Sequence, residues 1–150
     1  MLYFAYGSNM NEAELRARGV TILRAEKAFL KNHKIALTRY ALTRDGGVLD
    51  IIPNHDVVEG VLFELTDGDR GKVDAKEGVT VNAYEPIPVD IETEDGKVLS
   101  GVLTYKVCRK EDPPQASEEY KRSVLKGACD HGLSEEYRAK LKAVLEKTEV

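Results

Sequence analysis

Apolar residues in the first part of the chain come in short runs that are rich in β-branched and aromatic side chains, as is typical of strands. The first run, Leu2 to Tyr6, ends at Gly7-Ser8-Asn9, which predicts a strand that breaks into a turn. The other predicted strands are Lys34 to Thr38, Val48 to Ile52 after a turn at Gly46-Gly47, and Val57 to Leu65. These segments are expected to pair as an antiparallel sheet.

The strongest hairpin signal lies in the middle of the chain. Two alternating runs, Glu85 to Thr93 and Lys97 to Val107, flank Asp95-Gly96, a dipeptide that tolerates the positive φ angles of a tight turn. We therefore expect these two runs to be paired strands.

Two short helices are predicted between the strands. The first covers Asn11 to Arg18, with Asn9 or Asn11 as its N-cap and Gly19 as its stop signal. The second covers Asp67 to Lys76 and is ended by Gly78, which places Glu77 at its C-terminal edge.

The hydrophobic period becomes helical after Pro113-Pro114. Two stripes at helical spacing follow, with Ser117 and Ser134 as the expected N-caps. The stripes are Tyr120, Val124, Leu125 and Ala128, then Tyr137, Leu141, Val144 and Leu145. Strands first and helices last predict an α+β fold, and a small, mostly antiparallel β-barrel flanked by helices would hide the sheet edges. Residues 1–150 are expected to form a single domain that ends in a helical pair.

Composition excludes several classes of partner. The net charge of −4 and the pI near 5.5 give the chain no general attraction for nucleic acid or for anionic membrane surfaces. Its apolar start is too short for a signal segment, and no run is long enough to span a membrane. Cys108 and Cys129 are far apart, so neither a disulfide framework nor a zinc knuckle is expected, and a cytoplasmic location fits best.

The chain offers few groups with obvious chemistry. Cys129-Asp130-His131 is the one close group of potential metal ligands, and a core thiol beside a solvated pair is the favoured interpretation of it. His33 and His55 are expected to be structural or exposed. The turn from Tyr6 to Asn9 has two interpretations. Its N–H groups could converge on a carboxylate or a developing oxyanion, or it could be a tight turn with an asparagine cap. The residues alone leave both open.

Three segments resemble the gamma-glutamyl cyclotransferase and AIG2-like family. Tyr3-Phe4-Ala5-Tyr6-Gly7-Ser8-Asn9-Met10 resembles the opening signature of that family, and Asp74 to Val79 resembles the segment that carries its catalytic glutamate. In the tail, Ser117 to Tyr120, Gly127-Ala128, His131 to Leu133 and Tyr137 resemble the helical region of the cyclotransferase branch.

The resemblance implies a reaction and a set of site residues. A small-molecule γ-glutamyl substrate would cyclise to 5-oxoproline and release an amine, with Glu77 as general base and then acid, without cofactor or metal. The implied substrate-binding residues are Tyr3, Phe4, Ala5, Tyr6, Gly7, Ser8, Asn9, Tyr120 and Tyr84, with Tyr105 as a further candidate. A homodimer is compatible with the resemblance.

Substrate and activity stay open at this stage. The chain has Ser134 where the family pattern has proline, and Glu59 where an aromatic residue is common, so substrate choice is not fixed. The alternatives are a γ-glutamylamine cyclotransferase, a biosynthetic deprotecting relative, and a metabolite-binding module without turnover. A simple interaction domain ranks last, because no apolar stripe or one-signed charge patch stands out.

Overall fold

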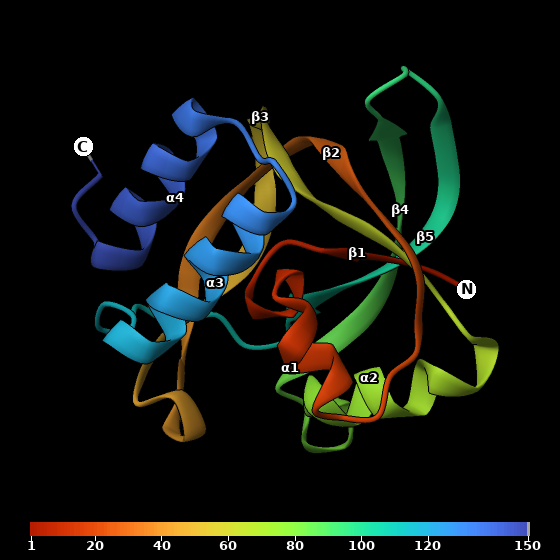
Figure 1. Cartoon of the computed structure of the whole chain (residues 1–150). Coiled ribbons are helices and arrows are strands. Elements are labelled where there is room, and N and C mark those ends of the chain that lie inside the picture. Colours follow the sequence, from red (N-terminus) through yellow and green to blue (C-terminus); the bar gives the residue numbers. More distant parts are fainter. Residues whose placement is uncertain (150) are drawn as a thin grey trace.

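A closed β-barrel forms the centre of the protein, and two helices pack side by side against one side of it (Figure 1). The computed structural model describes residues 1–149. Its strands are β1 (Leu2–Ala5), β2 (Ile22–Ala41), β3 (Gly46–Leu65), β4 (Tyr84–Thr93) and β5 (Val98–Val107). Its α-helices are α1 (Glu12–Arg16), α2 (Arg70–Lys76), α3 (Glu118–Asp130) and α4 (Glu135–Glu146). Short 3₁₀ turns lie at Ser8–Met10 (η1), Leu42–Arg44 (η2), Asp67–Asp69 (η3) and Val79–Val81 (η4).

The barrel has the order β1-β3-β2-β4-β5, and all neighbouring pairs are antiparallel except β1 with β5, which closes the barrel in parallel. The predicted hairpin is β4 and β5, joined through Gly96 at φ 84°. The expected α+β fold, a mostly antiparallel barrel with a C-terminal helical pair, is therefore confirmed. Within residues 1–149, no helix combines the length and the apolar character that a membrane span requires.

The strands β2 and β3 are longer than the sequence predicted. Each covers 20 residues, so the predicted strands at 34–38, 48–52 and 57–65 are parts of two long strands that pair with each other. Register shifts divide the ladder, for example between Lys31 and His33. Such bulges bend and twist a strand, which lets one long pair follow the curve of the barrel.

The predicted turn at Gly46-Gly47 was wrong. The chain reverses at Leu42–Arg44, and Asp45 takes the left-handed conformation at φ 52°. The two glycines lie within β3, where the segment before α3 passes directly over them. A Cβ at Gly46 would lie 2.7 Å from the Ser117 nitrogen, and one at Gly47 would lie 2.3 Å from the Pro114 oxygen. These glycines therefore serve close packing and not chain reversal.

The two C-terminal helices begin where the sequence predicted. The Ser117 hydroxyl accepts from the Tyr120 N–H at 3.2 Å, and the Ser134 hydroxyl accepts from the Tyr137 N–H at 3.1 Å. Both predicted stripes face the core, although Leu125 is only partly buried. The caps and the apolar faces together fix where α3 and α4 lie on the barrel.

The start of α4 is also tied to β3. Glu59 accepts hydrogen bonds from the Ser134 N–H at 2.9 Å and from the Ser134 hydroxyl at 2.8 Å. The Lys27 ammonium lies 3.6 Å from the same carboxylate. The two residues that differ from the family pattern therefore bind each other.

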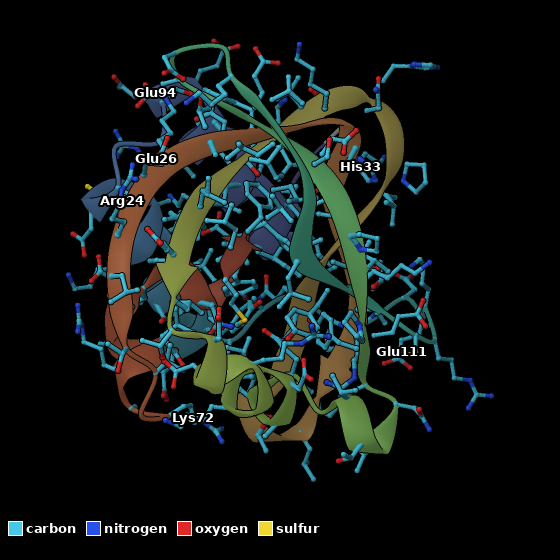
Figure 2. The ribbon with its side chains drawn as sticks, turned by 90° about the vertical axis from the view of Figure 1, so that its right-hand side faces the viewer. Arg24, Glu26, His33, Lys72, Glu94 and Glu111 are labelled. Carbon is cyan, nitrogen blue, oxygen red and sulfur yellow. The ribbon has the colours of Figure 1, made fainter. Side chains whose placement is uncertain are left out.

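The two short helices, α1 and α2, follow the strands β1 and β3. Asn11 caps α1 by accepting from the Ala13 N–H, and α1 ends at Arg16, two residues before the predicted end. The second helix ends at Lys76 as predicted, and Gly78 takes the left-handed conformation at φ 66°. Lys72 lies on α2 at the lower end of the barrel in Figure 2, and His33 lies toward the opposite end.

Helix α3 rests directly on the backbone that follows β1. A Cβ on Gly127 would lie 2.4 Å from the Met10 carbonyl carbon and 2.4 Å from the Asn11 nitrogen. Only a residue without a side chain allows this approach, so Gly127 sets the distance between α3 and the turn at Ser8–Met10.

We expect Gly127→Ala to lower the free energy of unfolding by about 1–3 kcal/mol, because the methyl group would force the helix and the turn apart. Gly71→Ala is the matched control, since nothing lies within 4 Å of its added Cβ and it lies within α2. The control should raise the free energy of unfolding by no more than about 1 kcal/mol. Urea denaturation of both variants is the measurement, and equal stabilities would refute the role given to Gly127.

Candidate active site

A cavity of about 330 Å³ opens at the end of the barrel where β1 breaks into the Ser8–Met10 turn. That turn, the C-terminal end of α2, the β2–β3 turn and α3 all contribute residues to its wall. The tyrosines in the wall are Tyr3, Tyr6, Tyr84, Tyr105 and Tyr120. Gly7, Ser8, Asn9 and Glu77 also border the cavity. The structure thus gathers most of the predicted site residues from distant parts of the chain.

Phe4 and Ala5 do not border the cavity, although they belong to the same sequence signature. Phe4 points to the opposite face of β1 from Tyr3, because side chains alternate along a strand, and it is fully buried against Gly60. Ala5 has only a methyl group, and it is buried as well. Both residues therefore pack the barrel and do not line the cavity.

Glu77 is held in the cavity by Asn9. The Asn9 amide nitrogen donates to Glu77 Oε1 at 2.8 Å and to the Tyr3 hydroxyl at 2.9 Å. The amide oxygen of Asn9 is buried and accepts no hydrogen bond within residues 1–149. Asn9 thus orients the carboxylate and presents an unused acceptor beside it.

The position of Glu77 follows from the end of α2. Glu77 keeps a helical conformation as the C-cap, and Gly78 then reverses the chain. Burial raises the pKa of Glu77, while the positive charges of Lys76 and Arg44 partly oppose this rise. The side chain keeps some exposure to the cavity, so it can exchange protons with a bound molecule.

Three tyrosine hydroxyls in the wall already donate within the protein. Tyr6 donates to the Tyr105 carbonyl at 2.7 Å, and Tyr84 donates to the Leu49 carbonyl at 2.6 Å. Tyr105 donates to the Asp74 carboxylate. These hydroxyls fix the wall of the cavity.

Tyr3 and Tyr120 are different, because their hydroxyls only accept. Tyr3 accepts from Asn9, and Tyr120 accepts from the Leu49 N–H at 3.1 Å. Neither hydroxyl hydrogen has an acceptor within residues 1–149. Burial raises the pKa of both tyrosines, so both stay protonated and can donate to a bound molecule.

The backbone of the turn offers further donors. The Met10 and Asn11 N–H groups bond to the Gly7 and Ser8 carbonyls at 3.0 Å each. In the described part of the chain, the N–H groups of Gly7, Ser8 and Asn9 have no such acceptor. Neighbouring unpaired N–H groups can bind a carboxylate or an oxyanion, and of the two predicted caps, Asn9 and Asn11, it is Asn11 that caps α1.

A cluster that the sequence did not reveal surrounds Glu14 of α1. Its carboxylate accepts from Arg44 at 2.9 and 3.1 Å and from the Ser123 hydroxyl at 2.8 Å, and the Lys76 ammonium lies 3.3 Å away. Burial alone would raise the pKa of Glu14, but the hydrogen bond from Arg44 and the charge of Lys76 bring it down to about 2. The Arg44 guanidinium also lies over the Tyr120 ring, 5.4 Å from its centroid.

The remaining polar candidates lie outside the cavity. Asp130 pairs with Lys126 at 2.7 Å, and His131 lies 3.2 Å from Glu12. Cys129 is an exposed free thiol, so the core position expected for it was wrong. His33 lies toward the other end of the barrel from α2 (Figure 2), and, like His55, it does not border the cavity. Within residues 1–149, none of these side chains forms a hydrogen bond or an ion pair with Glu77.

Comparison with known proteins gives a consistent result. The AIG2-like family model matches residues 57–141. The gamma-glutamylcyclotransferases of Bos taurus and Homo sapiens are 30% and 31% identical over 148 residues, which cover 95% of this chain and 78% of each relative.

Solved structures agree with the sequence relatives. A structure described as a gamma-glutamyl cyclotransferase superposes with a TM-score of 0.86 at 30% identity, covering 96% of this chain and 87% of the other. The likeness therefore includes the barrel, the loop after β1 and the helical pair. From its sequence, its fold and its cavity, the chain belongs to the AIG2-like family of gamma-glutamylcyclotransferase relatives.

Proposed function

We propose that this protein is a gamma-glutamyl cyclotransferase that converts a γ-glutamyl amino acid or amine into 5-oxoproline and a free amine. One observation carries the proposal: a carboxylate with a raised pKa, Glu77, is oriented by Asn9 inside a cavity whose wall also offers unpaired donors. The membership in a family with gamma-glutamylcyclotransferases supports the same reaction.

The reaction needs one proton acceptor that later becomes a donor. The α-ammonium of the glutamyl group is largely protonated at neutral pH, so Glu77 removes a proton from it before the amine can attack. The free amine then attacks the γ-carbonyl carbon of the same substrate and closes a five-membered ring. When the C–N bond to the leaving group breaks, Glu77 returns the proton to the leaving nitrogen. The ring nitrogen still carries one extra proton after the attack, and this proton passes to the released amine, which leaves as an ammonium ion. Nucleophile and electrophile belong to one molecule, so the scheme calls for no cofactor.

The unpaired donors suit the other charges of the substrate. Attack on the carbonyl places negative charge on its oxygen, and donors already in position stabilise that charge without reorganisation. The Gly7 to Asn9 N–H groups and the Tyr3 and Tyr120 hydroxyls are the candidates for binding this oxygen and the α-carboxylate. The free oxygen of Asn9 is suited to accept from the α-ammonium. Together they would hold the substrate folded back on itself, which lowers the entropic barrier to ring closure.

We expect Glu77→Gln to lower kcat for 5-oxoproline release by at least about 100-fold, because the amide cannot take the proton from the α-ammonium. The assay uses purified protein and a panel of γ-glutamyl amino acids and γ-glutamylamines. Glu85→Gln is the matched control, since Glu85 is exposed and pairs with Lys106 away from the cavity. Undiminished turnover by Glu77→Gln would remove Glu77 from the mechanism, and wild-type protein that binds but never turns over these compounds would favour a binding module.

The same variant should be more stable than the wild type at neutral pH. The pKa of Glu77 is raised in the folded state, so deprotonation favours the unfolded chain as the pH rises above the ordinary carboxyl pKa. Glutamine carries no such charge and can still accept from Asn9. Urea denaturation should show a higher free energy of unfolding for Glu77→Gln at neutral pH, with the gain shrinking toward about pH 4. Equal free energies of unfolding at neutral pH would mean that the charged carboxylate of Glu77 does not destabilise the folded protein.

A further inference from the structure

The wall of the cavity carries more positive charge than the catalytic scheme uses. Arg18, Arg39, Arg44 and Lys76 all border the cavity, while Glu77 is the one acidic residue in its wall within residues 1–149. Glu14 neutralises part of this excess by pairing with both Arg44 and Lys76. The remaining positive charge belongs to Arg18 and Arg39.

Arg39 differs from Arg18 in its surroundings. It lies near the end of β2, opposite Val48 of β3, and its side chain is half-buried, whereas Arg18 is exposed. In the described part of the chain, no carboxylate lies within ion-pair distance of Arg39 and its guanidinium makes no hydrogen bond, although its positive charge is one of those that oppose the rise in the pKa of Glu77. A guanidinium has five N–H donors and no acceptor. In residues 1–149, none of the Arg39 nitrogens is both fully buried and unpaired, so these donors are open to the cavity and can bind an anion there.

We propose that Arg39 determines substrate specificity by binding the carboxylate of the leaving amino acid, so that the cavity prefers γ-glutamyl amino acids over γ-glutamylamines. This inference rests on the proposed function. The glutamyl half of the substrate already has its partners in Glu77, Asn9 and the donors of the Gly7 to Asn9 turn. Arg39 borders the same cavity from a different element, the strand β2, where it lies opposite Val48 of β3.

The charge of the substrate fits the charge of the wall. A γ-glutamyl amino acid carries two carboxylates and one ammonium at neutral pH, whereas a neutral γ-glutamylamine carries one of each. Only the first has a carboxylate on the leaving side. The planar fork of an arginine matches a carboxylate with two parallel hydrogen bonds, which a lysine cannot reproduce.

Two substrates that differ by this one group give a direct test. γ-Glutamyl-L-alanine and γ-glutamylethylamide have the same glutamyl half and the same two leaving-group carbons nearest the nitrogen, and they differ by a carboxylate. We expect Arg39→Met to lower kcat/KM for γ-glutamylalanine by about 10- to 100-fold and to change it by less than about 3-fold for the ethylamide. Arg39→Lys should recover only part of the preference, because it keeps the charge and loses the fork.

Arg18→Met is the charge-matched control. It removes the same unit of charge from an exposed position beside the cavity, so it should leave the ratio of the two kcat/KM values within about 3-fold of the wild type. A loss of the same size on both substrates in Arg39→Met would overturn the proposal, since Arg39 would then act on the shared glutamyl half or on the fold. A preference lost equally in Arg18→Met would overturn it as well, because general attraction would explain it.

Failure of the proposed function would be visible separately. If the wild type releases 5-oxoproline from neither compound, calorimetric binding of the same pair still tests Arg39. The wild type should then bind γ-glutamylalanine about 10-fold or more tightly than the ethylamide, and Arg39→Met should bind both equally. Equal binding of the two compounds by the wild type would refute the role of Arg39.

Discussion

The arrangement of the site depends on a single carboxylate, that of Glu14, which meets three segments far apart in the sequence. Arg44 comes from the β2–β3 turn, Lys76 from the end of α2 and Ser123 from α3, and all three converge on Glu14. The contact does more than hold these segments together. Glu14 also offsets part of the positive charge of Arg44 and Lys76 that lowers the pKa of Glu77, and its own negative charge acts with burial to raise that pKa. The ion pairs that join these segments therefore also influence the pKa of Glu77.

Local chemistry explains which parts of the fold could be predicted from the sequence. Caps such as Ser117 and Ser134, the Asp95-Gly96 turn and the helical stripes depend on neighbours within a few residues, and the structure confirms them. The turn expected at Gly46-Gly47 failed because glycine has two uses. Here it lets a distant segment pass over β3, and nothing in the local sequence reveals that contact. The full length of β2 and β3 was missed for a related reason, since their bulges interrupt the alternation that marks a strand.

The same distinction between local patterns and contacts of distant segments applies to the site. The family resemblance located Glu77, the Gly7 to Asn9 turn and Tyr120, and the structure brings them to one cavity. The bridge from Asn9 to Glu77 joins residues that are 68 positions apart, so no local pattern could have indicated it. Arg39 was also missed, because the sequence does not distinguish it from other charged residues in strands. Only the three-dimensional structure shows that it borders the cavity without an ion-pair partner. The sequence thus identifies the candidate reactive groups, and the fold shows which groups surround them.

The bond between Glu59 and Ser134 has a consequence for how such a chain can diverge. A proline at position 134 would remove both the N–H and the hydroxyl that Glu59 accepts from, leaving a half-buried carboxylate with only the more distant Lys27 beside it. An apolar residue at position 59 would in turn leave the Ser134 N–H without its acceptor. Either single replacement would give a less stable protein than the pair, so the two positions are epistatic and are expected to covary in evolution. A lineage that acquired this pair would therefore tend to keep it, whatever happened to its substrate.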